Sequence, residues 1–229
     1  MIRMTSKLSI VIPIYNESQQ LPELFDHLSP YRERGHQIIF VDGESEDNSV
    51  ELIDQAGFVV VPSTRSRAAQ MNNGARQATQ DILLFLHADT RLPENADALI
   101  VSALSNPRQV WGRFDAHITG DHFLLTVVGK MMSMRSRLTG IATGDQGIFI
   151  KRTFFENIGG YASQPLMEDV EISRRLVRLA KPVCLRECVS TSGRRWIHRG
   201  VMKTIALMWY LRFLYWRGVD PKELAKKYR

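Results

Sequence analysis

Cysteine is scarce in this chain of 229 residues, which holds only Cys184 and Cys188. Two cysteines are too few for a disulfide framework, and their spacing is not the C-x-x-C of a zinc site. Because residues i and i+4 of a strand face the same way, we expect two free, buried thiols. This expectation is consistent with a reducing compartment.

Long apolar runs are also missing. Residues 1–7, ahead of the first apolar run, contain no apolar h-region, so we expect no signal peptide. No run of about 20 uncharged apolar residues occurs, so we expect no membrane-spanning helix. These absences predict a cytoplasmic protein that is at most peripheral to the membrane.

Three glycine motifs are absent as well. No G-x-G-x-x-G follows the first apolar run, which disfavours a Rossmann dinucleotide site, and no G-x-x-x-x-G-K-[ST] marks a P-loop. The G-x-S-x-G elbow of serine hydrolases does not occur either. Any nucleotide site in this chain must therefore lack a glycine-rich phosphate loop.

Acidic residues are few near the C-terminus. Residues 194–229 hold ten Lys and Arg against two acids, so this segment carries a charge of +8 while the rest of the chain carries about −2. A basic segment of this kind can meet nucleic acid, anionic lipid or a phosphorylated substrate. The 44% hydrophobic content can fill the core of one large domain.

Short apolar runs alternate with helix-forming segments along the first 90 residues. The runs are Leu8–Pro13, Gln37–Asp42, Phe58–Pro62 and Ile82–Leu86. Continuous apolar runs are typical of strands that are buried on both faces, and the alternation with helices is typical of parallel sheets. We therefore predict an α/β fold with a doubly wound, mostly parallel sheet and helices on both faces.

The second half of the chain is less regular. The expected helices are Pro93–Leu104, Phe123–Leu138, Phe154–Tyr161 and Glu168–Leu179, and the expected strands are Val110–Ile118, Ile148–Lys151 and an edge strand over Pro182–Val189. A long aromatic, amphipathic helix, apolar on most of its circumference, is expected over Val201–Arg217.

Polar side chains follow three of the predicted strands where each one ends. They are Tyr15-Asn16-Glu17, Asp42-Gly43-Glu44-Ser45 and His87-Ala88-Asp89, and Arg65 and Arg67 follow the remaining strand. Ligands bind at the carboxyl ends of strands in open α/β sheets. Carboxylates accept hydrogen bonds from a base or ribose and arginines meet phosphate, so this set favours a nucleotide.

His87 and Asp89 could also hold a divalent cation. A cation there could bind the phosphate oxygens of a nucleotide. The alternative is a polar turn after a core strand, in which Asp89 or Thr90 caps the following helix.

Six motifs together resemble family 2 glycosyltransferases. They are Ile10–Glu17, Val41–Ser45, Arg67 with Asn73–Ala75, Leu86–Asp89, Gly144–Gly147 and Glu168–Asp169. They occur in the order of the family and cover about residues 8–180. The resemblance implies a GT-A fold, an inverting mechanism and a nucleotide-sugar donor that binds with Mg²⁺ or Mn²⁺.

The resemblance also implies roles for individual residues. The base and ribose would be held by Pro13, Tyr15, Asn16, Glu17 and Asp42, the base or diphosphate by Arg67, and the donor also by His87 and Ala88. The metal would bind to Asp89, and Asp169, with Glu168 beside it, would take the acceptor proton as general base. The acceptor would be bound by Gly144, Asp145, Gln146, Arg195 and Trp196. Residues 1–107 would form the donor half of the domain, 108–190 the acceptor and catalytic half, and 191–229 a basic helical extension.

The chain departs from the family pattern in two places. His87 replaces the first acid of the usual D-x-D motif, so it either ligates the metal or hydrogen bonds a sugar or backbone group. Ser192–Trp196 resembles the Q-x-x-R-W box of processive members but lacks the glutamine. We therefore expect transfer of a single sugar to the hydroxyl of a small or lipid-linked acceptor.

Three alternatives stay open at this stage. A sugar-nucleotide nucleotidyltransferase has a similar architecture, but a glycine-rich loop would follow its first strand. A non-catalytic nucleotide- or anion-binding protein would not need acids at its strand ends, and we expect no nucleic acid as partner. Glu168 and Asp169 could also serve only to complement the dipole of their helix.

The helix over Val201–Arg217 allows two arrangements. It could be buried against the catalytic domain or against a second copy of the chain. It could instead lie in a membrane interface, with its aromatic residues at the headgroups and its Lys and Arg on anionic lipid.

Overall fold

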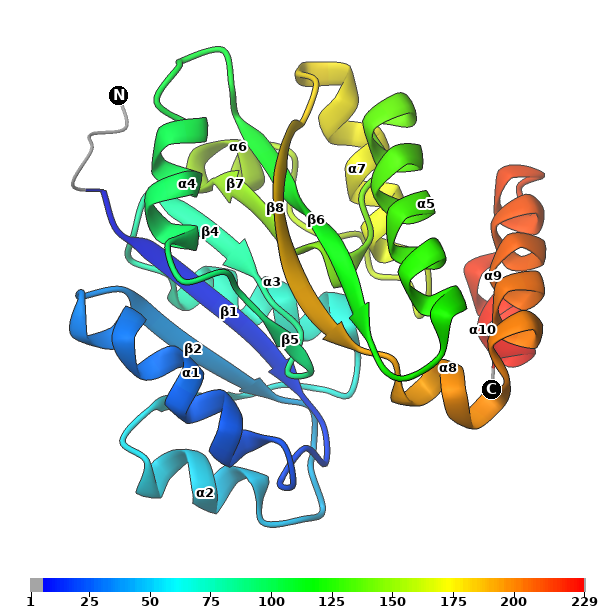
Figure 1. Cartoon of the computed structure of the whole chain (residues 1–229). Coiled ribbons are helices and arrows are strands. Elements are labelled where there is room, and N and C mark those ends of the chain that lie inside the picture. The colour runs from blue at the N-terminus through cyan, green and yellow to red at the C-terminus, as the bar shows by residue number, and fades with distance from the viewer. Residues whose placement is uncertain (1–5, 229) are drawn as a thin grey trace.

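The computed structural model describes residues 6–228, apart from the side chain of Arg195. Within this range an eight-stranded sheet has the order β3-β2-β1-β4-β7-β6-β8-β5 (Figure 1). Its strands are β1 (Leu8–Ile14), β2 (Gln37–Asp42), β3 (Val59–Pro62), β4 (Ile82–Phe85), β5 (Thr90–Arg91), β6 (Trp111–Thr119), β7 (Ile148–Lys151) and β8 (Val183–Ser192). The first four form the expected parallel unit, and β7 joins β4 in the antiparallel sense.

Helices cover both faces of the sheet. They are α1 (Leu21–Glu33), α2 (Ser49–Gln55), α3 (Arg67–Gln77), α4 (Ala96–Ala103), α5 (Phe123–Thr139), α6 (Arg152–Asn157), α7 (Glu168–Leu179), α8 (Arg194–Arg199), α9 (Val201–Trp216), α10 (Pro221–Tyr228) and the short 3₁₀ helix η1 (Gly144–Gln146).

Strand β1 shows why the apolar runs are continuous. Ile10 and Ile12 pack with α1, α2 and α4, whereas Val11 packs with α3, α6 and α7 on the other face. Because successive side chains of a strand point to opposite faces, a strand covered on both sides is apolar at most positions. The layered α/β architecture predicted from the sequence is confirmed.

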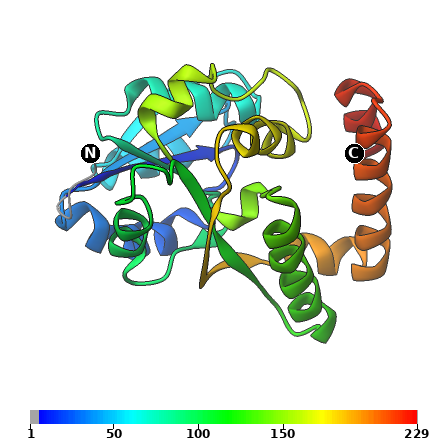
Figure 2. The same ribbon diagram turned by 90° about the horizontal axis from the view of Figure 1, so that it is seen from above.

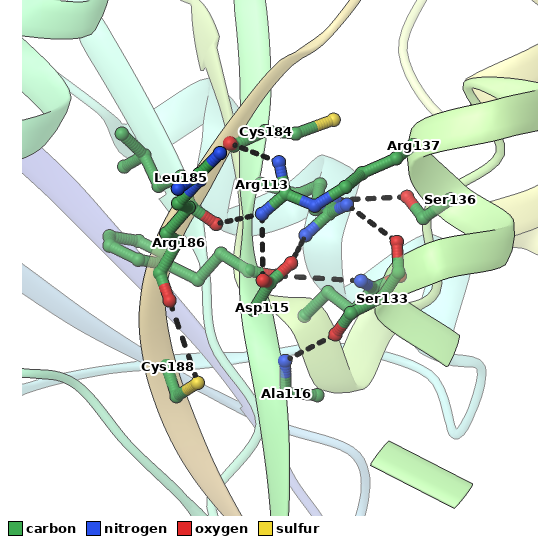
Figure 3. A network of polar contacts seen from close by, with 12 residues as sticks. Arg113, Asp115, Ala116, Ser133, Ser136, Arg137, Cys184, Leu185, Arg186 and Cys188 are labelled. Carbon is green, nitrogen blue, oxygen red and sulfur yellow. Dashed lines mark hydrogen bonds and ion pairs between the residues drawn. The ribbon is translucent and has the colours of Figure 1, made fainter. Parts of the chain in front are cut away.

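A buried ion-pair network joins α5 to β6 (Figure 3). The Arg113 side chain is fully buried, and its Nε donates to Ser136 Oγ at 2.9 Å while an Nη donates to the Ser133 carbonyl. Asp115 pairs with both Arg113 and Arg137. A single carboxylate therefore neutralises two guanidinium groups, and nothing in the sequence pattern pointed to this pairing.

The edge strand expected over Pro182–Val189 is found as the first part of β8, where the recorded pairing is with β6, and β5 joins β8 beyond it at Ser190 and Thr191. The expected burial of the two thiols is wrong. The register between β6 and β8 also shifts, so that Asp115 pairs with Cys188 directly after Phe114 pairs with Leu185. This bulge breaks the period of two, and the expected buried thiols are instead half-buried at Cys184 and exposed at Cys188.

The C-terminal helices form a hairpin beside the main domain (Figure 2). It contacts the domain through a small apolar cluster in which Met167 packs with Leu211 of α9 and Leu224 of α10. The expected amphipathic character of α9 is not found. Large apolar side chains also lie on its solvent-exposed surface, namely Met202, Trp209, Tyr210, Phe213 and Trp216. Among residues 6–228, no helix has the length and apolarity that crossing a bilayer requires.

The network around Arg113 gives a stability prediction. Asp115→Asn leaves a buried guanidinium without its countercharge, and breaking a buried pair in this way costs about 3 kcal/mol. Urea unfolding followed by circular dichroism should show this loss. Asp121→Asn, an exposed acid in the turn after the same strand, is the matched control and should change little. Equal stability of the two variants would contradict the role of the network.

Candidate functional site

The loops after β1 and β2 are joined by hydrogen bonds. The Asn16 backbone N–H donates to Ser45 Oγ at 2.9 Å, and the Glu46 N–H donates to Asn16 Oδ1 at 2.8 Å. Asn16 has a φ of 53°, a left-handed conformation that Asn tolerates better than most residues. The Glu17 N–H donates to Ser49 Oγ. The two strand ends therefore present one continuous polar rim.

Positive charges face this rim from the start of α3. The Arg65 guanidinium lies over the Tyr15 ring, 3.7 Å from its centroid, and Arg67 is exposed at the first position of α3. Asp42 is buried at the end of β2 and accepts the Ser45 N–H. Arg65 therefore contacts the rim at Tyr15, and Asp42 is buried beside it, while the roles of Arg67 and of the half-buried Pro13 in donor binding stay predictions.

Gln70 was missed by the sequence reasoning. Its side chain is buried, and its Nε2 donates to the carbonyls of Ile14 and Val41, the ends of β1 and β2. A Cβ at Gly43 would lie 2.8 Å from Gln70, so Gly43 leaves the space that this amide needs. Gln70 therefore holds the two strand ends in place, and only a tertiary contact identifies that role.

The tip after β4 carries the residues expected to meet the metal and donor. His87 is buried and its Nδ1 lies 3.1 Å from Asp145 Oδ1, while Ala88 is buried below the tip. Asp89 is half-buried, and the Thr90 hydroxyl donates to its carboxylate at 3.3 Å. His87 therefore already has a carboxylate partner, and Asp89 is the acid of this tip that reaches solvent.

The residues at this tip fit one mode of cation binding. Among the described residues, no group of three or more His, Cys, Asp or Glu side chains could hold a metal by itself. Mg²⁺, however, is commonly held by one or two carboxylates together with substrate phosphates. A single accessible carboxylate at Asp89 suits that mode, which needs the donor to complete the ligand set.

Helix η1 brings the predicted acceptor loop against this tip. A Cβ on Gly144 would lie 2.4 Å from His87 Nε2, so only glycine allows this approach. Asp145 contributes the carboxylate that meets His87. Gln146 is fully buried, where its Oε1 accepts the Thr143 N–H and its Nε2 donates to the Phe114 carbonyl. Its side chain therefore orders the loop.

Asp169 lies in the first turn of α7 and points at the same loop. Its Oδ2 accepts the Gly144 N–H at 3.0 Å, a bond between residues 25 positions apart in the chain. Met167, just before α7, has a φ of 65°, an uncommon conformation for a residue with a long side chain. Such conformations tend to cluster at functional sites, where the surrounding structure holds them in place.

The surroundings of Asp169 change its acidity. Burial raises the pKa of the Asp169 carboxyl from its ordinary 3.8 to about 6, and the negative charge of Glu168 adds to the rise. The Gly144 N–H acts in the opposite direction. A carboxylate with a pKa near neutrality can accept a proton and release it again at physiological pH.

A small pocket joins these groups. Its lining residues are Met71, Phe85, His87, Gly144, Ile148, Tyr161, Glu168 and Asp169. Tyr161 was missed by the sequence reasoning, and burial beside Asp169 and Glu168 raises its pKa well above the usual range. The tip after β4, the start of η1 and the start of α7 therefore meet at one apolar-walled site.

The remaining predicted acceptor residues lie on α8. Trp196 is half-buried and packs against an apolar cluster that includes Leu125 and Val201. The side chain of Arg195 lies outside the described residues. Neither residue lines the pocket at Asp169, and their role in acceptor binding stays a prediction.

Solved structures with the same architecture are glycosyltransferases of the GT-A fold. A mannosyltransferase of Pyrobaculum calidifontis, in complex with GDP-Man and Mn²⁺, superposes with a TM-score of 0.61 at 18% identity and covers 81% of this chain and 56% of its own. Staphylococcus aureus TarS 1–349, in complex with UDP-GlcNAc, superposes with a TM-score of 0.67 at 13% identity and covers 82% and 59%. At these identities the likeness shows the fold.

The sequence comparison gives the family. Residues 9–156 match Glycosyl transferase family 2, and the chain belongs to this family. An undecaprenyl-phosphate 4-deoxy-4-formamido-L-arabinose transferase of Yersinia enterocolitica is 30% identical over 156 residues, which are 63% of this chain and 48% of that protein. The chain spans about half the length of the curated relatives it matches.

The raised pKa of Asp169 gives a prediction with a defined sign. Asp169→Asn should keep nucleotide binding and lose roughly 100-fold or more in turnover, because the amide cannot accept a proton. In the wild type, kcat should fall as pH drops through about 6. A pH–rate profile, measured with a donor that a mass-spectrometric screen has identified, tests both expectations. A turnover of Asp169→Asn within a few-fold of wild type would exclude Asp169 as the base.

The stability of the folded protein should respond to pH in the opposite sense to kcat. Because the folded pKa of Asp169 lies above its ordinary 3.8, its contribution to stability is present below 3.8 and is lost as pH rises through about 6. Asp169→Asn should remove this decline. Urea unfolding between pH 4 and about 7 compares the two proteins.

Proposed function

We propose that the protein is an inverting glycosyltransferase that moves one sugar from a nucleotide-sugar donor to an acceptor carried on a lipid. The observation that carries this proposal is the Asp169 carboxylate, which accepts the Gly144 N–H and faces the pocket beside His87. Residues 1–107 would bind the donor, 108–190 the acceptor and 191–229 would extend the acceptor side. Membership of the family favours glycosyl over nucleotidyl transfer.

The chemical step uses the residues of this pocket. An acceptor oxygen attacks the anomeric carbon, the bond from that carbon to the diphosphate oxygen breaks, and the bonding electrons leave with the nucleoside diphosphate. The acceptor proton passes to Asp169 on the opposite side from the leaving group. Attack from that side inverts the anomeric centre, and general-base assistance typically contributes about 10²–10⁴ in rate.

Donor binding would use the rim at β1, β2 and β4. Tyr15, Asn16, Glu17 and Asp42 would contact base and ribose, and Arg67 the diphosphate. A divalent cation, Mg²⁺ or Mn²⁺, held by Asp89 and the donor phosphates would offset the negative charge that grows on the leaving group. His87, which already meets Asp145, would position the tip instead of ligating the ion.

The proposed lipid-linked acceptor is supported by a relative and by the surface. The relative from Yersinia enterocolitica is named for undecaprenyl phosphate. Exposed apolar side chains also lie at helical spacing on α5, at Phe123, Val127, Met131, Met134 and Leu138, and on α9. With the basic residues of 194–229, these surfaces suit an anionic membrane interface.

Donor binding has a direct test. Isothermal titration with UDP, GDP and dTDP, each with and without Mn²⁺, should show metal-dependent binding of one nucleotide. Asp89→Ala should abolish the dependence on metal and keep the fold, because this half-buried tip residue contributes little to the core. His87→Ala should lose less. Wild-type Mn²⁺-dependent affinity in Asp89→Ala would contradict the metal assignment, and no binding of any nucleotide to the wild type would contradict the proposed function.

Membrane association can be tested without disturbing the site. Trp209→Ser with Trp216→Ser on α9, or Phe123→Ser with Leu138→Ser on α5, should weaken sedimentation with anionic vesicles, and added salt should weaken wild-type binding. Val59→Ser, which changes a 54% exposed side chain on the edge strand β3, is the matched control and should bind as wild type does. Equal sedimentation with neutral and anionic vesicles, together with a stable dimer, would favour pairing with a second copy instead.

A further inference from the structure

The hairpin of α9 and α10 meets the main domain at the segment that carries the proposed base (Figure 2). Three side chains are buried at this junction, namely Met167 just before α7, Leu211 of α9 and Leu224 of α10, and both leucines are fully buried. The partly buried apolar residues that pack against them belong to the hairpin, except Leu166 and Val170. The main domain therefore contributes to this cluster with residues that directly flank the proposed base.

Two further contacts join α9 to the same segment. Gln164 Nε2 donates to the Leu166 carbonyl at 2.9 Å and lies 3.5 Å from the Tyr215 hydroxyl of α9. The Arg174 guanidinium of α7 lies over the Tyr215 ring, 5.8 Å from its centroid. Helix α9 thus contacts both the loop that precedes the base and the helix that carries it.

The backbone of Met167 is in a conformation that needs support. Its φ of 65° is left-handed, a region in which the side chain of a bulky residue is crowded by its own backbone. Such conformations persist where the surrounding structure holds them. The Met167 carbonyl accepts the Glu171 N–H at 2.9 Å, in the first turn of α7. The conformation of Met167 therefore sets the direction in which α7 starts, and with it the position of Asp169.

We propose that the hairpin of α9 and α10 positions the catalytic base, by holding Met167 in its left-handed conformation through Leu211 and Leu224. From this start of α7 the Asp169 carboxylate reaches the Gly144 N–H. The three apolar residues are positioning residues, because none of them lines the pocket at the base. The inference rests on the proposed role of Asp169 in glycosyl transfer and extends the functional unit to the end of the chain.

Loss of this support has two measurable consequences. Met167 would relax to a common backbone conformation, so that Asp169 would leave the Gly144 N–H and meet water. A backbone amide that loses its hydrogen bond exchanges its hydrogen faster.

The pKa of the Asp169 carboxyl would change as well. Burial is the main cause that raises this pKa to about 6, so exposure lowers it toward the ordinary 3.8, and loss of the Gly144 N–H offsets only part of that fall. The titratable groups around Asp169 are the same in every variant below, and they are Glu168, Tyr161, His87, Asp145 and Arg135.

The test uses leucine variants of the whole 229-residue chain. Leu211→Ala and Leu224→Ala remove the side chains that cover Met167. Leu104→Ala is the matched control, since Leu104 is also fully buried but packs in the core cluster of β1, α1 and α4. Leu211→Met and Leu224→Met keep the apolar volume and serve as rescue variants. Valine at either position is the milder change if an alanine variant does not fold.

Nuclear magnetic resonance reports both consequences. Hydrogen exchange at the Gly144 amide is measured relative to the Ile10 amide of β1, and the Asp169 carboxyl is titrated after assignment with Asp169→Asn. We expect the alanine variants of the hairpin to raise relative exchange at Gly144 by roughly 10-fold or more. The pKa of Asp169 should fall toward 3.8 in the same variants. The control and the methionine variants should match wild type in both measurements.

Turnover shows whether the positioning serves the reaction. With a donor that a mass-spectrometric screen has identified, kcat of Leu211→Ala and Leu224→Ala should fall by roughly 10-fold to 100-fold, because a small displacement of a catalytic group is costly. The Kd for UDP, GDP or dTDP with Mn²⁺, whichever binds the wild type, should stay unchanged, since the proposed donor residues lie at the ends of β1, β2 and β4. Methionine at either position should restore kcat.

The outcomes separate this inference from the proposed function. Wild-type exchange at Gly144 and a wild-type pKa of Asp169 in the hairpin variants would overturn the positioning role, as would equal changes in Leu104→Ala. If Asp169→Asn loses turnover in that case, the proposed function stands alone. If the hairpin variants change both measurements while Asp169→Asn keeps turnover, the hairpin positions Asp169 but this residue is not the base, and the inference about a catalytic base fails with it.

Discussion

The hydrogen bond from the Gly144 N–H to the Asp169 carboxylate holds the candidate site together. It connects η1 to the first turn of α7, and Gly144 in turn lies against His87 at the tip of β4. Three segments that are far apart in the chain thereby meet at one point. The bond also opposes the rise in the pKa of Asp169 that burial causes, so the carboxyl is left near 6 and not higher. The same bond thus affects both the geometry of the site and the acidity of the proposed base.

The C-terminal hairpin is connected to the same site. Leu211 of α9 and Leu224 of α10 pack on Met167, whose left-handed backbone conformation places Glu168 and Asp169 at the start of α7. A hairpin that otherwise lies beside the domain therefore supports the residue that precedes the proposed base.

Charge is distributed unevenly where α5 packs on β6. Asp115 satisfies Arg113 and Arg137, while Arg135 keeps two buried nitrogens without partners among the described residues. The ion pairs of Asp115 with Arg113 and Arg137 connect α5 to the sheet, so they stabilise the helix that carries Arg135. Buried donors of a charged group without an acceptor are costly for the folded protein.

The sequence alone determined the layered α/β fold, since its continuous apolar runs and helix periods are local patterns that the sheet merely assembles. It also indicated the tip His87–Asp89 and the acids of α7, because motif order survives in one dimension. The bulge opposite Asp115, the pairing of β5 with β8 and the roles of Gln70 and Tyr161 came only from the tertiary structure. The side chain of Gln70 meets the carbonyl of Ile14, 56 residues away, and His87 meets Asp145, 58 residues away. Residues so distant become neighbours through packing of the whole domain, and no local spacing encodes which of them will meet.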